Sequence, residues 1–254
     1  MGQLPIEQHI LLLLEIAVLP ILCIRIWAAG LHKIYGFFFA YLVLEFFQAL
    51  IPVLVPLRSL LYRDLFVFSQ GLIVAFYVLV VMELYSKTLR DLAGIAAVAR
   101  RFLRIALVLG AVFSALLFRM EQNTGAITGY LFVFERTVMS ILVIFLFLIA
   151  GFLLYYPVPL GRNVIAYLAG YSAYLLTTAT VALINNVGYS WNRLLGGVDM
   201  AVSLACFLLW LFVLTSQGER RRVVLGHQWN PGDERRLLAQ LEAINASLLR
   251  SSRK

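Results

Sequence analysis

Charged residues are scarce in this chain. They make up 13% of its 254 positions, while 62% of the positions are hydrophobic. A soluble domain has about a quarter charged residues and about half apolar ones. This much apolar surface cannot be buried inside one soluble core of this length. The sequence therefore predicts an all-α membrane protein, because helices satisfy their own backbone hydrogen bonds in lipid.

Cysteine is also rare. The two cysteines, Cys23 and Cys206, both lie in apolar stretches, which leaves no disulfide framework and no CxxC pair. The residues from Met1 to Glu7 include no basic side chain, and no small-x-small cleavage site follows the first apolar run. We therefore expect that run to stay in the protein as a membrane span, not to be removed as a signal peptide.

Several membrane-protein chemistries are excluded by residues that the apolar stretches lack. No lysine lies in the last stretch, which excludes a retinal Schiff base, and the histidines lie at or beyond the ends of the stretches, which excludes paired haem ligands. Asp199 is the only aspartate within a stretch, so an intramembrane aspartyl protease is excluded too. Because the sequence contains no nucleophile–base pair and no metal-ligand set, we expect neither an enzyme nor a cofactor or metal site.

Seven apolar stretches are long enough for a bilayer core, which takes about 20 helical residues to cross. They cover residues 8–29, 34–57, 65–86, 103–120, 127–155, 163–187 and 196–217. The sequence thus predicts a bundle of seven transmembrane helices over residues 1–217, followed by a basic tail over 218–254.

Basic residues predict the orientation of the bundle. Counted over the loops, the span ends and the tail, sixteen of them fall on the side that carries the C-terminus and four on the other side, and every loop follows the same alternation. Cytoplasmic loops carry the excess of lysine and arginine. We therefore expect a multi-pass protein of the inner or plasma membrane with its N-terminus outside and its C-terminus in the cytoplasm. The net charge of +8 reflects this topology and does not indicate a nucleic-acid partner.

Two segments on the predicted cytoplasmic side have helical patterns. Residues 87–104 form either a short amphipathic helix on the membrane surface or a helical extension of the neighbouring spans. In the tail, Asn230 and Pro231 are typical of a helix start, and apolar residues recur along one face of a predicted helix over 231–250. This helix could lie on the membrane, pack beneath the bundle, or bind a cytoplasmic protein or a second copy of the chain.

Polar side chains inside the spans are candidates for a functional site, because each ionisable group costs about 2.5–3.5 kcal/mol to insert. With the predicted orientation, most of them lie in the outer half, and several share one helix face. We expect an outward-facing polar cavity that binds a small molecule. Its candidate residues are Glu15, Glu45, Gln48, Gln70, Glu135, Arg136, Tyr171, Tyr174, Thr178, Asn185, Asp199 and Cys206.

The alternative for any one of these residues is a purely structural role, because interhelical hydrogen bonds stabilise membrane bundles by about 0.6 kcal/mol each. Two functions fit the set as a whole. The first is a sensory or scaffold protein whose outer cavity binds a small ligand or is capped by another membrane protein, and whose tail contacts a partner. The second is a small-solute or proton-coupled carrier or channel, with Glu45 near the middle of the membrane and Tyr167 and Tyr171 continuing the path inward.

Overall fold

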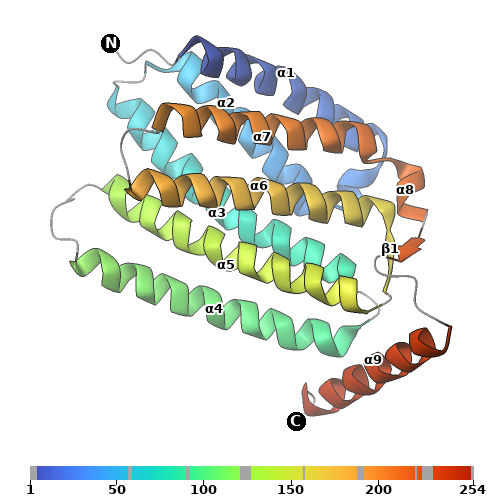
Figure 1. Ribbon diagram of the computed structural model, residues 1–254. Coiled ribbons are helices and arrows are strands. Elements are labelled where there is room, and N and C mark those ends of the chain that lie inside the picture. The colour runs from blue at the N-terminus through green and yellow to red at the C-terminus, as the bar shows by residue number, and fades with distance from the viewer. Residues whose placement is uncertain are drawn as a thin grey trace.

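The computed structural model describes residues 5–56, 59–89, 92–120, 127–156, 158–187, 192–220, 222–224 and 231–252. Helices dominate the fold (Figure 1). They are α1 (Ile6–Ala28), the 3-10 turn η1 (Leu31–Lys33), α2 (Gly36–Leu54), α3 (Leu60–Thr88), α4 (Ala93–Met120), α5 (Ile127–Tyr155), α6 (Arg162–Val187), α7 (Asn192–Val213), α8 (Ser216–Arg220) and α9 (Pro231–Ser252).

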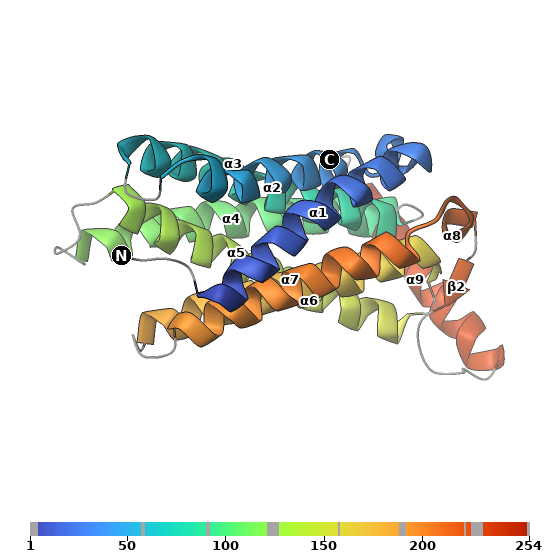
Figure 2. The same ribbon diagram turned by 90° about the horizontal axis from the view of Figure 1, so that it is seen from above.

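Six of the long helices form a closed ring. Around the ring, α1 packs on α2, then come α3, α5, α6 and α7, and α7 packs back on α1. Helix α4 lies outside this ring against α5, and α9 lies against α4 (Figure 1). Seen from above, α1 crosses α6 and α7 obliquely (Figure 2). We call the end of the bundle at which α7 finishes and beside which α8 lies the tail end, and the opposite end, where α1 begins, the head end.

The ring helices are also the membrane candidates. Among the described residues, six segments are long and apolar enough to cross a membrane: Ile6–Ala28, Gly36–Leu54, Leu60–Thr88, Phe134–Tyr155, Arg162–Val181 and Leu194–Val213. Large apolar side chains are exposed on the outside of the bundle, among them Leu54 at 73% and Phe68 at 74%. Exposed apolar surface on this scale indicates contact with lipid. The six apolar helices and their exposed apolar side chains together indicate a multi-pass helical membrane protein.

The expected segment 103–120 belongs to α4, which is not one of these six. The two interpretations of residues 87–104 are also resolved over the described part of that segment. Helix α4 begins at Ala93 and continues without a break, so residues from 93 onward extend the following helix and do not form a separate surface helix. Helix α7 ends at Val213, four residues before the predicted end of the last span.

The tail contains more structure than the sequence predicted. Strand β1 (Pro159–Gly161) pairs antiparallel with strand β2 (Arg222–Val224), a small exception to the all-α prediction. The pairing gives the backbone groups of two loop segments hydrogen-bond partners that a loop beside a bundle would otherwise lack. The predicted helix over 231–250 corresponds to α9, with Pro231 as its first residue; Asn230 lies outside the described residues.

Helix α9 packs on the start of α4. Leu237 and Leu241, on the predicted apolar face, are 8% and 4% exposed, whereas Ile244 on the same face is 42% exposed. The Asn245 side-chain oxygen Oδ1 accepts hydrogen bonds from the backbone N–H groups of Gly94 at 2.7 Å and Ile95 at 3.4 Å. These two N–H groups have no partner within α4, as at the start of any helix. The side chain of Asn245 therefore caps α4 from the far end of the chain.

Candidate functional site

A chain of buried hydrogen bonds joins three helices in the head half of the bundle. Gln48 on α2 donates through Nε2 to Gln70 Oε1 on α3 at 2.6 Å, and Gln70 Nε2 donates to Glu135 Oε1 on α5 at 2.6 Å. Gln70 and Glu135 are each only 9% exposed. A buried amide needs partners for both its donor and its acceptor, and this arrangement supplies both for Gln70.

Carboxylates from four helices gather around this chain. Glu15 on α1, Glu45 on α2, Glu135 on α5 and Asp199 on α7 are close enough to interact electrostatically. Asp199 accepts a hydrogen bond from Thr178 Oγ1 on α6 at 2.9 Å. We call these four acidic residues with Gln48, Gln70 and Thr178 the carboxylate layer. It brings seven of the twelve sequence-predicted site residues together.

Positive charge does not balance this layer. Among the described residues, the only ion pair within 4.0 Å joins the neighbouring surface residues Arg63 and Asp64. Arg136 is next to Glu135 in the sequence, and its backbone oxygen accepts a hydrogen bond from Ser140, but no acidic partner lies in ion-pair contact with its side chain in the described part of the chain. Arg136 therefore does not bind the helices together through a salt bridge of this kind.

Aromatic rings fill the bundle immediately on the tail side of this layer. The Tyr77 and Tyr174 hydroxyls are hydrogen-bonded at 2.9 Å, and Tyr41 lies edge-on to Tyr171 with ring centroids 6.1 Å apart. One turn further, Tyr167 packs against Phe38, Tyr171 and Trp210. We call these rings the aromatic plug; they are Tyr41, Tyr77, Tyr167, Tyr171, Tyr174, Phe38 and Trp210.

The plug is tightly packed. Tyr41, Tyr171 and Trp210 are 0% exposed, and Tyr167 is 1% exposed. The hydroxyls of Tyr167 and Tyr171 have no hydrogen-bond partner among the described residues, so ring packing holds them in place. Edge-to-face ring pairs stabilise by about 0.5–1.5 kcal/mol beyond the burial of their surface. Tyr171 and Tyr174, which the sequence placed in the polar cavity, thus belong to the plug.

Cys206 lies at the same depth as the plug, in the contact between α6 and α7. Its thiol donates to the backbone oxygen of Gly170 at 3.3 Å, and the residue is 5% exposed. Cys206 therefore lies nearer the tail end than the carboxylate layer and is not part of it. The side chain of Asn185, another predicted site residue, lies outside the described part of the chain.

A second polar network lies at the tail end and was not identified from the sequence. Asn163, 0% exposed at the start of α6, donates through Nδ2 to Thr215 O at 2.7 Å and accepts from Thr215 N at 3.3 Å. Tyr35 donates to Glu219 Oε2 of α8 at 2.8 Å. Burial first, and then this hydrogen bond, raise the pKa of Tyr35 above its ordinary value. The network fixes α8 against the ring.

Glu83 has a structural role that its place in the sequence did not show. Near the end of a predicted span it resembles a side chain that reaches toward water. Instead, its carboxylate accepts from the backbone N–H groups of Phe37 at 3.3 Å and Phe38 at 3.0 Å, at the start of α2. A carboxylate in this position caps a helix and opposes its dipole. The contact joins residues 45 positions apart, so no local pattern could have predicted it.

Metal binding by the carboxylate layer has no structural support. Within the described residues, no group of three or more histidine, cysteine, aspartate and glutamate side chains is arranged to hold a metal ion. The four carboxylates each come from a different helix.

Comparison with known proteins adds no assignment. The chain matches no family model, and no curated protein or solved structure is significantly similar to it. The function therefore has to be inferred from the carboxylate layer, the plug and the tail.

Proposed function

We propose that the protein is a sensory or scaffold membrane protein that binds a small organic cation in its carboxylate layer. One observation carries the proposal: four carboxylates from four helices are near enough to interact electrostatically, and none has an ion-pair partner within 4.0 Å among the described residues. Buried like charges repel strongly unless protons or a cation neutralise them. Because no group of three or more of these side chains is arranged to hold a metal ion among the described residues, we propose an organic cation as the ligand. The protein acts by binding and not by catalysis.

The closed plug supports sensing over transport. A carrier needs a path from its binding site to the other side of the membrane. Rings that are fully buried, such as Tyr171 and Trp210, fill that direction in this conformation. A bound cation would instead hold α1, α2, α5 and α7 together, and a ligand that binds one arrangement of the helices more tightly shifts the protein toward it.

The proposal includes the topology expected from the sequence. The basic residues favour a plasma-membrane protein with its N-terminus outside, its tail in the cytoplasm, and residues 103–120 of α4 as a seventh span. The carboxylate layer would then face the outside. In the cytoplasm, α9 would carry the output to a cytoplasmic protein or a second copy of the chain. The exposed residue Ile244, next to the docked Leu241, supports a further contact there.

Thermal unfolding of the purified full chain tests cation binding. We expect choline chloride or guanidinium chloride at millimolar concentration to raise the unfolding temperature above that in sodium chloride at equal ionic strength, and the rise to saturate. A cation present at 100 times its Kd stabilises by about 2.7 kcal/mol. Glu45→Gln or Asp199→Asn should abolish the shift, while the control Asp64→Asn, an exposed carboxylate, should keep it.

An unchanged response in Glu45→Gln and Asp199→Asn would mean that the carboxylates only bind the helices together. The same conclusion would follow if neither cation shifted the unfolding temperature of the unmodified chain.

A proton-coupled carrier is the second candidate, and one observation favours it. The Glu45 oxygen Oε2 is shielded from solvent and has no hydrogen-bond partner among the described residues. Such an acid at membrane depth is typical of a proton relay. The test is acidification of liposomes that contain the protein and an internal pH dye. Proton flux that depends on the protein and is lost in Glu45→Gln would favour the carrier over the sensor.

A further inference from the structure

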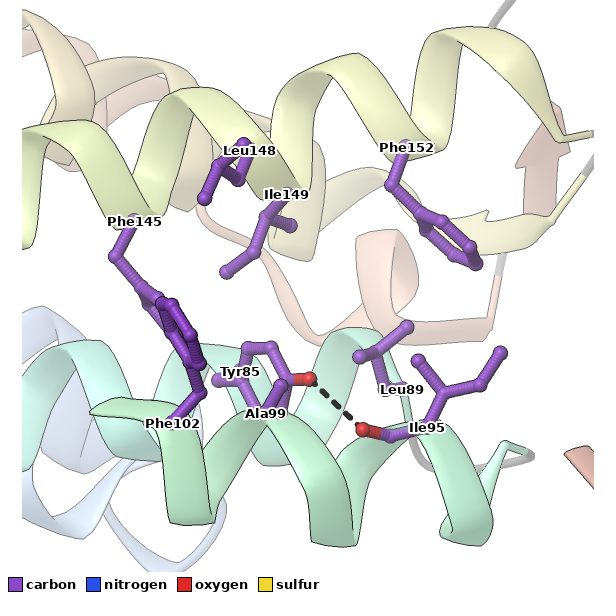
Figure 3. A pocket seen from close by; sticks show the side chains of 9 residues that line it. All are labelled: Tyr85, Leu89, Ile95, Ala99, Phe102, Phe145, Leu148, Ile149 and Phe152. Atoms are coloured by element: carbon purple, nitrogen blue, oxygen red, sulfur yellow. Dashed lines mark hydrogen bonds between the residues drawn. The ribbon is translucent and has the colours of Figure 1, made fainter. Parts of the chain in front are cut away.

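An apolar groove lies at the tail end, far from the carboxylate layer. It has a volume of about 250 Å³ and is bounded by the end of α3, the start of α4 and the second half of α5. The side chains of Phe145, Ile149 and Phe152 point into it from α5, facing Leu89 and Ile95 across the space (Figure 3). Sites for drug-sized molecules are larger, about 300–1,000 Å³. This one suits a slender apolar chain.

The groove opens toward the lipid-facing surface. Its floor is buried, with Ile149 4% exposed, but Phe102 on α4 and Leu148 on α5 at its rim are 63% and 59% exposed. The exposed surface continues along both helices as large apolar side chains, among them Ile144, Phe147, Ile105, Val108 and Leu109. A molecule that enters the groove from this side comes from the hydrocarbon of the membrane.

The walls of the groove are held in position. The Tyr85 hydroxyl donates to the backbone oxygen of Ile95 at 3.3 Å, as the dashed line in Figure 3 shows. The backbone N–H of the same residue, Ile95, donates to Asn245 Oδ1 on α9 at 3.4 Å. The start of α4 is therefore fixed both to α3 and to α9, and a preformed site loses less entropy when it binds.

Three arginines lie near the groove on α4, on other faces of the helix than the groove-lining residues Ala99 and Phe102. Arg100 lies within electrostatic range of the Tyr85 hydroxyl, which lines the groove. Arg104 donates through Nε to the backbone oxygen of Arg100 at 3.3 Å, so its guanidinium turns back toward the tail end. Arg101 is exposed beside them, and α4 contains no acidic residue. Anionic headgroups are attracted to such clusters at the membrane surface.

We propose that this groove binds one acyl chain of an anionic phospholipid, whose phosphate headgroup is held by Arg100, Arg101 and Arg104. The apolar lining takes the chain, the opening toward lipid gives it access, and the arginines at the tail end meet the headgroup at the membrane surface. This bound lipid differs from the lipids around the bundle because it occupies a defined site. It would bind with a saturable stoichiometry of about one and with a preference for anionic headgroups.

Native mass spectrometry of the purified full chain in detergent tests the site. The probes are palmitoyl-oleoyl phosphatidylglycerol and the matched phosphatidylcholine. We expect one phosphatidylglycerol to bind saturably and more tightly than phosphatidylcholine, by about fivefold for each arginine that contacts the headgroup. Ala99→Trp, which fills the groove, should remove this saturable binding. Val112→Trp, on the exposed face of the same helix, should leave it unchanged.

Charge variants keep the test decisive if the bulky residue at position 99 prevents folding. Arg101→Gln and Arg104→Gln should each weaken phosphatidylglycerol binding by about fivefold and leave phosphatidylcholine binding as it was. The exposed arginine at the head end provides the control, Arg63→Gln, which should change neither. Equal binding of the two lipids by the unmodified chain, or unchanged binding in a folded Ala99→Trp protein, would overturn the proposal and leave only non-specific lipid around the bundle.

Discussion

At the scale of single residues, Gly170 shows how closely α6 approaches α7. A Cβ atom at this position would lie 2.6 Å from Trp210 Nε1 and 3.2 Å from Leu209 Cδ2. The indole of Trp210 cannot move aside, because it is fully buried against Phe38, Tyr171 and Phe207. The absence of a side chain at residue 170 therefore permits the packing of the aromatic plug.

We expect Gly170→Ala to destabilise the protein by about 1–3 kcal/mol, the usual cost of overpacking a core. The measurement is the thermal unfolding midpoint in detergent. Gly151→Ala is the matched control: it also lies inside a long helix, and nothing lies within 4 Å of its added methyl group. That control should be neutral or slightly stabilising, because alanine favours helix over glycine. If the two variants unfold alike, the close contact with Trp210 is absent.

Because the pKa of Tyr35 is raised in the folded protein, we expect the free energy of unfolding to depend on pH. The folded-state pKa of this tyrosine is raised by burial and by its hydrogen bond to Glu219, so the folded protein keeps the phenol proton at a pH at which the unfolded chain, with a pKa of about 10, releases it. The unfolded state then binds fewer protons, and stability falls as pH rises above about 10.

Tyr35→Phe should therefore lose about 1 kcal/mol near pH 7 through the missing hydrogen bond. Its deficit relative to the unmodified chain should shrink as the pH rises above about 10, because phenylalanine has no proton to lose. Chemical unfolding at a series of pH values measures the difference. A deficit that grows in alkali would contradict the contact with Glu219.

At the scale of elements, two helices begin on caps supplied by distant parts of the chain. Glu83 caps α2 from α3, and Asn245 caps α4 from α9. Apolar periodicity and length were sufficient to predict the long helices, and Pro231 marked the start of α9. The caps could not be predicted, since they depend on which helices become neighbours. The β1–β2 pairing could not be predicted either, because it joins two loops that are about sixty residues apart in the sequence.

Asn245→Ala should release α9 from α4. The loss of a helix cap costs about 0.5–2 kcal/mol, and here it removes the polar part of the contact that also buries Leu237 and Leu241. Hydrogen exchange at the Gly94 and Ile95 amides should become faster. Gln240→Ala, an exposed position on the same helix, is the control and should not change it. Equal exchange in the two variants would mean that α9 does not cap α4.

At the scale of the whole molecule, the carboxylate layer and the aromatic plug lie at different depths along the ring of helices. Each of α2, α3, α6 and α7 carries a carboxylate-layer residue nearer the head end and a plug residue nearer the tail end. The sequence predicted Gln70 and Asp199 in the outer half of the membrane and Glu45 near its middle, because span direction follows from the order of the spans. It could not show that Tyr171 and Tyr174 pack on Tyr41 and Tyr77 as a plug, since that depends on the order of helices around the ring.

We propose that the carboxylate layer is accessible from outside and that the plug closes it toward the tail end. Labelling of Gln48→Cys in a Cys23→Ser background tests this most directly, with membrane-impermeant thiosulfonates added to intact cells. We expect a cationic reagent to label position 48 faster than an anionic one, by about tenfold through electrostatic steering. The remaining thiol, Cys206, should stay largely unlabelled. Equal rates for the two reagents, or labelling of position 48 only from the cytoplasmic side, would contradict it.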